Sequence, residues 1–361
     1  MKINLQKGFF GEKERELLTH GEMSVSAFRY DSGVEALRIK NKRGYFIFLP
    51  FQGQQVWKLN IDGNDISMKT TIPEPVPTEE YLKTYGGFMY HCGISAFGMP
   101  QADDTHPQHG ETPNIAYKSA HIICGEDGQG RYIAVGGTLD YDIAFTRKYR
   151  FSPECRMYED GTLLHISIAL ENLRSYPMEY MYLCHLNFRP QNGARLVYSA
   201  KRDAGHIKLH RVIPDSLPEA QKARLAAYMD KISENPAVCD DIGNPDEIYD
   251  PEICFAIKYE ADEEGRAYTM QYKKGEGAYF VSHPADVLPV GVRWISRTKN
   301  EDALGMVLPA TAEHLGYSDS RRKGYIKTLA AGETLRFRID AGFLDEGAAA
   351  EMCEKINGMI K

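Results

Sequence analysis

Hydrophobic and polar residues alternate along many short stretches of this chain. Between residues 164 and 170, Leu or Ile occupies every second position, and His165 and Ser167 lie between them. Residues 335–340 repeat the pattern, with two arginines and an aspartate in the polar positions. Because successive side chains of a β-strand point to opposite faces of a sheet, each stretch predicts a strand with one buried face.

Further strands are predicted where β-branched and aromatic residues gather between turn residues. They cover residues 45–49, 131–135, 143–151, 180–189, 253–259 and 278–282. Strands of this number, with few helical stretches between them, predict an all-β protein.

A few short helices are also expected. Apolar residues recur at i, i+3, i+4 and i+7 between Leu225 and Ile232, and Ser216 and Glu219 precede them with the spacing of a capping box. Shorter helices are predicted over residues 79–84 and, near the end of the chain, 349–356.

Two irregular stretches interrupt this pattern. Residues 71–78 contain three prolines, which cannot donate backbone hydrogen bonds, so they predict a surface loop. Residues 98–114 form a longer loop with His106 and His109, and loops of this length in compact domains are often functional. Since no repeat or composition shift marks a boundary, we expect a single domain over residues 1–361.

Composition excludes several classes of protein. With 43% hydrophobic and 26% charged residues the chain is typical of a globular protein, and its net charge of −7 disfavours nucleic acid as a partner. No stretch approaches the roughly 18 consecutive apolar residues of a membrane span, and the charged N-terminus lacks a secretory signal, so no membrane partner is expected. Seven scattered cysteines without a Cys-x-x-Cys pair argue against a disulfide framework and favour the cytoplasm.

Two histidines are the main candidates for chemistry. His185 shares one strand face with Asn187, and an imidazole beside an amide suits a groove that binds hydroxyl groups. His109 follows Gln108 and precedes Gly110, which permits a close backbone approach. The alternatives are a strand-end histidine that faces water and a loop histidine that stabilises its own turn.

Sugar-ring opening is a reaction that this pair could serve. One group must give a proton to the ring oxygen while others hold and deprotonate the anomeric hydroxyl, and imidazole is suited to such transfers near neutral pH. We therefore predict that His109 and His185 come together at a groove for a small carbohydrate.

Other residues allow further contacts with a ligand. Trp57 and Trp294 could pack on the C–H face of a sugar, although core packing is the alternative. Arg321 belongs to a polar, cationic stretch, residues 318–323, that could hold an anionic substituent or simply face solvent.

A metal site is a separate possibility. His91, His106, His109 and Glu111 are residue types that ligate zinc, but their spacing matches no strong signature, and ordinary loop histidines are the alternative. The chain also lacks G-x-S-x-G, G-x-x-x-x-G-K-[ST] and a strand-associated G-x-G-x-x-G. We therefore expect neither a nucleotide nor a redox cofactor.

Several of these motifs occur in an order that resembles the aldose 1-epimerase (galactose mutarotase-like) superfamily, in particular its little-characterised bacterial branch. The resemblance covers most of the chain. The motifs are Gly86-Gly87, His91-Cys92-Gly93, Gln108-His109-Gly110, the strands around 164–170 and 181–188, and the turn and strand over 329–335.

The resemblance implies a large antiparallel β-supersandwich with a sugar groove across one concave sheet. In that case His109 would bind the substrate and assist at the ring oxygen, and His185 would act as the general acid. Asp246 or Glu247 would match an acidic residue that binds sugar hydroxyls.

One position departs from the family pattern. The general base of this branch is a glutamate just before a proline on a late strand, and here Leu308 precedes Pro309. Leucine cannot accept a proton, so Glu313 or Glu111 would have to substitute. Three functions follow: an aldose 1-epimerase-like isomerase, a sugar-binding or regulatory protein that has lost the base, and a metal-dependent isomerase or lyase. The sequence does not identify the sugar.

Overall fold

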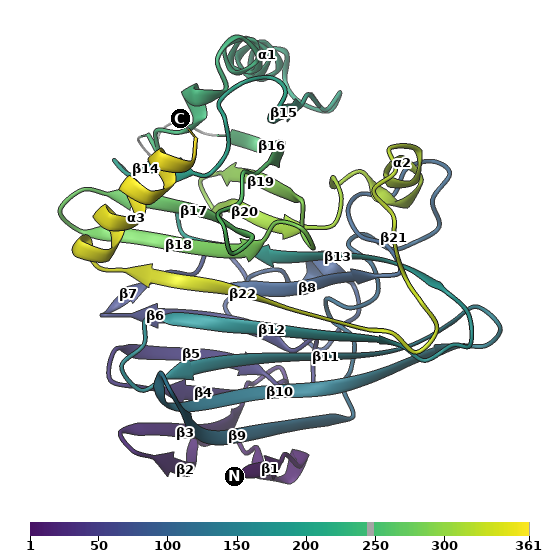
Figure 1. Ribbon diagram of the computed structural model, residues 1–361, viewed down its shortest axis with the longest axis vertical. Helices are drawn as coiled ribbons and strands as arrows, with labels where there is room; N and C mark the ends of the chain where they lie inside the picture. Colours follow the sequence, from purple (N-terminus) through teal and green to yellow (C-terminus); the bar gives the residue numbers. More distant parts are fainter. Residues whose placement is uncertain (244–248, 361) are drawn as a thin grey trace.

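The computed structural model describes residues 1–243 and 249–360. Within them the strands form two large antiparallel sheets that lie one behind the other as layers (Figure 1). The first sheet has the order β1 (Lys2–Asn4), β9 (Ser119–Asp127), β10 (Gly130–Ile143), β11 (Arg147–Tyr158), β12 (Leu163–Asn172), β22 (Thr334–Leu344), β18 (Gly277–Pro284), β17 (Arg266–Lys273) and β14 (Arg195–Tyr198).

The second sheet carries the candidate site. Its order is β15 (Ile207–His210), β16 (Tyr249–Lys258), β19 (Val290–Arg297), β20 (Asp302–Ala310), β13 (Met178–Leu186), β8 (Met89–Ile94), β6 (Gln55–Ile61), β5 (Gly44–Leu49), β4 (Glu35–Lys40), β3 (Met23–Arg29) and β2 (Arg15–His20). Two short strands join it at the side, β21 (Lys327–Leu329) on β13 and β7 (Asn64–Asp65) on β6.

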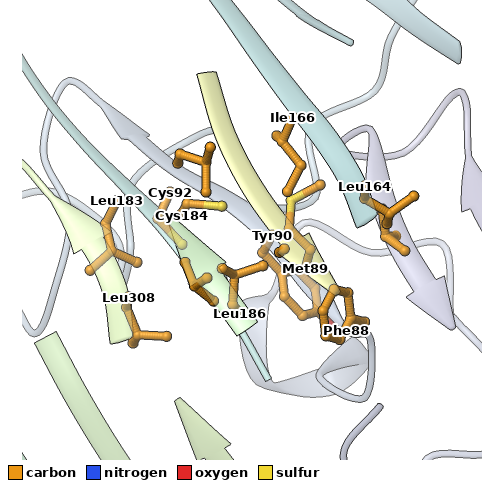
Figure 2. Packing of buried hydrophobic residues seen from close by; sticks show 14 of the residues in the cluster. Phe88, Met89, Tyr90, Cys92, Leu164, Ile166, Leu183, Cys184, Leu186 and Leu308 are labelled. Carbon is orange, nitrogen blue, oxygen red and sulfur yellow. The ribbon is translucent and has the colours of Figure 1, made fainter. Parts of the chain in front are cut away.

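The hydrophobic core lies between the two sheets. Leu164 and Ile166 of β12 belong to the same buried cluster as Leu186 of β13 and Met89 of β8, so side chains of both layers meet there (Figure 2). Each fully buried side chain of this size stabilises the fold by roughly 1.5–3 kcal/mol. Burial on one face of each strand is therefore the main contribution that holds the sheets together.

Most predicted strands are confirmed, including the one-sided burial of β12, where Leu164, Ile166, Ile168 and Leu170 are all buried. The expected strand over residues 143–151 is wrong. β10 ends at Ile143, β11 begins at Arg147, and Phe145 lies in the turn between them with φ of 67° and 98% of its surface exposed. Because Phe145 is apolar, the sequence pattern predicted a continuous strand where the chain forms the tip of a hairpin.

The helices agree with the expectations in part. α1 (Glu219–Glu234) buries Leu225, Met229 and Ile232, and α3 (Glu346–Met359) buries Ala349 and Ile356. The expected capping box of α1 is absent from the described residues, because Pro218 occupies the N-cap position without a side-chain hydrogen bond.

The remaining helical segments are short. The stretch predicted as a helix over 79–84 is a 3-10 turn, and two further 3-10 turns and α2 were not expected. Their bounds are η1 (Lys7–Phe9), η2 (Tyr81–Thr84), η3 (Pro236–Cys239) and α2 (Gly316–Arg322). In the part of the chain that the structure describes, no helix has the length and apolar character needed to cross a bilayer.

Candidate functional site

A pocket opens on the second sheet, where β16, β19, β20 and β13 lie side by side. It encloses about 550 Å³ between its walls, including space open to solvent. Its lining combines aromatic, apolar and titratable side chains, a combination typical of sites for small molecules. The lining residues are Tyr81, Leu82, Tyr85, Met99, Gln108, His109, Leu183, His185, Glu252, Cys254, Val292, Trp294, Leu308 and His314.

His185 is held in one tautomer by Asn187. The side-chain amide of Asn187 donates to the carbonyl of Gly87 (2.9 Å), so its oxygen must be the atom that faces His185 Nδ1 at 2.7 Å. An amide oxygen only accepts hydrogen bonds, which makes Nδ1 the protonated ring nitrogen. Nε2 of the neutral ring therefore keeps its lone pair and is the atom that can accept a proton from a ligand.

His109 reaches the same pocket from the long loop. Its ring centroid lies 5.2 Å from that of His185, with the rings at 82° to each other. Its backbone has a φ of 61°, which is uncommon for a residue with a side chain, and its carbonyl accepts from the amide of Gly93 (3.1 Å). The structure thus brings together two histidines that are 76 positions apart in the sequence.

Gly110 allows this loop to approach the sheet. Its φ is 82°, and a Cβ at this position would lie 2.1 Å from the carbonyl oxygen of Ala96. Only glycine combines this conformation with such a close backbone contact. The His109-Gly110 pair therefore fixes where the imidazole enters the pocket.

Burial keeps the pocket histidines neutral. It lowers the pKa of His185 to about 4, partly offset by the hydrogen bond to Asn187, and it lowers the pKa of His314 to about 4 as well. The pKa of His109 lies well below its ordinary value, first through burial and then through the neighbouring His185. At neutral pH these three rings are therefore hydrogen-bonding groups and proton acceptors rather than cations.

Glu252 supplies a carboxyl group to the pocket. The indole Nε1 of Trp294 donates to its Oε2 at 2.5 Å, and the Trp294 ring lies 5.6 Å from the ring of His185. Although much of Glu252 remains exposed, packing around its carboxyl group raises the pKa, and the hydrogen bond from Trp294 offsets only part of this effect.

Leu308 also lines the pocket, so the residue at the expected base position faces the site but cannot transfer a proton. It is 1% exposed and packs in the core cluster with Leu183 of β13 (Figure 2). The pairing of β19 with β20 is irregular here: Val292 lies opposite Leu308, whereas Trp294 lies opposite Gly305. Such bulges re-aim side chains and are frequent beside active sites.

Several solved structures have a similar fold. A candidate aldose 1-epimerase from Klebsiella pneumoniae is 18% identical and superimposes over 97% of this chain and 92% of its own, with a TM-score of 0.79. A galactose mutarotase-like protein from Clostridium acetobutylicum is 12% identical over 90% and 100%, with a TM-score of 0.57. One from Lactobacillus casei is 14% identical over 86% and 100%, with a TM-score of 0.51. The chain has the galactose mutarotase-like fold.

Sequence comparisons add little to this assignment. The family model described as "Domain of unknown function (DUF4432)" matches residues 31–204. A comparison with curated proteins finds no match. The all-β supersandwich expected from the resemblance is confirmed, whereas the low identities show the fold alone and leave the activity to be proposed from the site.

Within the galactose mutarotase-like fold, the predicted site residues separate into four groups, the last of which lies away from the pocket. Gln108 and Trp294 line the pocket with the two histidines. Asn187 is fully buried behind His185, so it orients the imidazole rather than binding a ligand directly. Asp246 and Glu247 lie outside the described residues.

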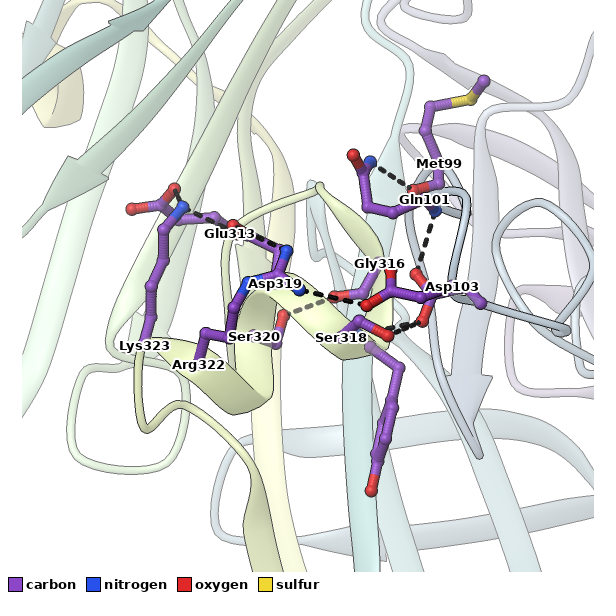
Figure 3. Close-up of polar contacts among 12 residues, drawn as sticks. Met99, Gln101, Asp103, Glu313, Gly316, Ser318, Asp319, Ser320, Arg322 and Lys323 are labelled. Carbon is purple, nitrogen blue, oxygen red and sulfur yellow. Dashed lines mark hydrogen bonds and ion pairs between the residues drawn. The ribbon is translucent and has the colours of Figure 1, made fainter.

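Three predicted site residues are placed elsewhere. Trp57 is 1% exposed inside a separate hydrophobic cluster, so the expectation that it binds a sugar is wrong and the core alternative holds. Arg321 lies on α2, outside the pocket lining, and its guanidinium bonds with Glu179. Glu313 is also absent from the lining and pairs with Lys208 at 3.3 Å and Lys323 at 2.7 Å, the latter drawn in Figure 3. Two ammonium groups hold its pKa below the ordinary value, so it is a poor substitute for the missing base.

The proposed metal ligands do not converge. His91 is buried and bonds Tyr182 through Nδ1 (2.8 Å), and Glu111 accepts from Ser95 and Tyr149. Among the described residues, no three His, Cys, Asp or Glu side chains are arranged to hold a metal ion. The group of His91, His106, His109 and Glu111 is therefore not a ligand set.

Three polar atoms around the pocket have no hydrogen-bond partner among the described residues. They are the Tyr81 hydroxyl, Nδ1 of His109 and Nδ1 of His314, and all three are buried. Buried polar atoms are nearly always satisfied, so each of these three atoms needs a partner that the surrounding protein groups do not supply.

Proposed function

We propose that this protein interconverts the anomers of a sugar by opening its ring, and that His185 and Glu252 are the proton-transfer pair. The observation that carries the proposal is the fixed tautomer of His185, which leaves Nε2 as an acceptor in a pocket that also holds a carboxyl group. The shared fold of the candidate aldose 1-epimerase from Klebsiella pneumoniae supports a carbohydrate as the ligand.

The reaction needs only proton transfers. The anomeric hydroxyl gives its proton to Nε2 of His185, C1–O forms a double bond, and the bond between C1 and the ring oxygen breaks. The carboxyl group of Glu252 gives its proton to the ring oxygen. After rotation about C1–C2 the ring closes on the other face of C1, and both protons return.

These roles follow the pKa shifts in the pocket. A histidine with a pKa of about 4 is unprotonated near neutral pH, and a carboxyl group with a raised pKa holds its proton over a wider range. When the pair holds one proton, that proton therefore resides on the carboxyl group and leaves the neutral imidazole as the acceptor, the reverse of the role that the resemblance implies for His185.

The other pocket residues bind and orient the sugar in this proposal. His109 and Gln108 offer hydrogen bonds to hydroxyl groups, and Trp294 and Tyr81 offer aromatic surface to the C–H face of the ring. The scheme uses no nucleotide, redox cofactor or metal. A cytoplasmic location belongs to the proposal as well, on the scattered cysteines of the sequence.

The test is exchange NMR on a panel of aldoses with purified protein. We expect acceleration of anomer exchange for at least one sugar, and a loss of about 100- to 10,000-fold in kcat for His185→Ala and for Glu252→Gln. Glu313→Gln removes a carboxylate that lies outside the pocket and serves as the matched control. Full activity of Glu252→Gln together with loss in Glu313→Gln would refute the assignment of the carboxyl group.

A second candidate function is sugar binding without turnover. Leu308 favours it, because the residue at the family's base position faces the pocket with hydrocarbon. This alternative predicts saturable binding in calorimetry and no acceleration of anomer exchange. Acceleration that disappears with Glu252→Gln would reject it.

A further inference from the structure

The floor of the pocket is built from apolar side chains on four neighbouring strands. Cys254 of β16, Val292 of β19, Leu308 of β20 and Leu183 of β13 all line it. Val292 pairs directly with Leu308, and Leu183 pairs with Ala310, two residues along β20 from Leu308. Each of the four is at most 8% exposed, so the floor is closed by packed carbon and sulfur atoms.

The polar groups line the same pocket beside these residues, since His185 follows Leu183 by two positions on β13 and Glu252 precedes Cys254 by two on β16. His185 and His109 lie together, with their ring centroids 5.2 Å apart, and Glu252 is bonded to Trp294 at 2.5 Å. His314 belongs to the lining as well. A sugar in the pocket would therefore find hydrogen-bond partners along its edges, whereas a substituent directed at the floor would meet carbon and sulfur atoms.

The pocket also offers no cation to a charged ligand. Among the described lining residues there is no lysine or arginine, and the histidines are neutral. Residues 244–251, which precede Glu252, contain no lysine or arginine in the sequence either. A second groove shares Tyr81, Leu82 and Gln108 with the pocket, and its lining includes Glu79, Glu80 and Glu111. Its one lysine, Lys83, is paired with Glu80 at 2.7 Å.

Resting on the function proposed above, we infer that the natural ligand is an uncharged deoxy sugar, with its missing hydroxyl at the position that meets the apolar floor. A hydroxyl group pressed onto this floor would give up its hydrogen bonds to water and receive none in return. A hydrogen or methyl group at the same place keeps the contact and loses nothing. A phosphate or carboxylate would be desolvated beside Glu252 without a counter-ion.

The expected preference is moderate. Apolar pockets discriminate against an added hydroxyl group by factors of about 10 to 100 rather than by many orders of magnitude. We therefore expect at least one deoxy sugar to bind about 10- to 100-fold more tightly than its fully hydroxylated partner. Sugar phosphates and uronates should bind more weakly than either.

Calorimetry with matched sugar pairs tests the inference on the full chain. The pairs are D-glucose with 6-deoxy-D-glucose and with 2-deoxy-D-glucose, D-galactose with 6-deoxy-D-galactose, and L-mannose with 6-deoxy-L-mannose. Glucose 6-phosphate and glucuronate are the anionic probes. Leu308→Gln, which adds hydrogen-bonding atoms to the floor, should reduce the preference for the deoxy sugar, and Leu308→Met should preserve it. If Leu308→Gln does not fold, Val292→Thr replaces it as a nearly isosteric polar variant.

The outcomes separate this inference from the proposed function. Equal or tighter binding of every hydroxylated sugar would overturn the inference and leave anomer exchange untouched. Tightest binding of glucose 6-phosphate or glucuronate would overturn the inference that the ligand is uncharged. Failure of every neutral sugar to bind would overturn both the inference and the function on which it rests.

Discussion

Asn187→Asp is the variant that discriminates most sharply between the possible roles of His185. The new carboxylate would lie where Oδ1 of Asn187 now accepts from Nδ1 at 2.7 Å. A negative charge this close to an imidazole favours the protonated ring and raises its pKa by about 1–3 units. The pKa of His185, now about 4, should therefore rise to roughly 5–7.

The effect on activity depends on which way the proton moves. With a rise of about two units, the unprotonated fraction of His185 at pH 5 falls from about 0.9 to about 0.1. If neutral His185 accepts the anomeric proton, kcat/KM at pH 5 should drop by about tenfold, and the acid limb of the pH profile should move upward with the pKa.

Two measurements check this prediction. Exchange NMR gives kcat/KM between pH 4 and 8, and ¹⁵N NMR of the imidazole gives the pKa of His185 directly. Asn60→Asp, on β6, adds the same charge outside the pocket lining and serves as the control. Because the aspartate also loses the donor to the Gly87 carbonyl, circular dichroism must first show that the variant is folded. A rise in activity at pH 5 would refute the reasoning, since it would mean that the protonated ring donates.

The remaining predictions concern pH, the loop and the buried charges. In the wild type, kcat/KM should fall by about tenfold per pH unit above the raised pKa of Glu252, and Glu252→Gln should abolish this limb in a pH series. Gly110→Ala should lower the free energy of unfolding by about 1–3 kcal/mol or more in urea titrations, because its Cβ would lie 2.1 Å from the Ala96 carbonyl; an unchanged midpoint would contradict the loop geometry. Asp240→Leu should cost about 3–5 kcal/mol, because it removes the carboxylate that pairs with the buried guanidinium of Arg293 at 3.3 Å. Arg202→Met, at a partly exposed partner of the same carboxylate, should cost less.

The strands were predictable because a strand with one buried face has an apolar residue at every second position. β12 follows that rule along its whole length, and β22 follows it over residues 334–339, after which both of its faces are buried. The rule failed where an apolar residue lies outside the core, as at the exposed Phe145. It also missed α2, a polar helix whose Ser318 hydroxyl donates to Asp104 of a distant loop at 2.6 Å. Contacts of this kind depend on tertiary structure, and local composition does not encode them.

In the candidate site, the approach of the two histidines was predictable from the sequence, whereas the position of Glu252 was not. His109 and His185 stand among polar neighbours that mark them in the sequence, and their approach in space follows from the fold. No feature of the sequence distinguishes Glu252 in this way. It precedes the predicted strand over 253–259, and the pairing of Cys254 with Trp294 brings it to the pocket. Glu313 was the reasonable alternative by sequence position, yet Lys208 and Lys323 neutralise it in space.

The packing of Leu308 limits how this protein can be redesigned. Its side chain contributes to the core and also closes the pocket, so a glutamate introduced there would carry its charge into hydrocarbon next to Leu183. Introducing a base at this position by one substitution would thus lower the stability of the fold and place the carboxylate in an unfavourable environment. Engineering of catalysis on this scaffold should instead begin from the strand that bears Glu252, where solvent and an indole already accommodate an acid.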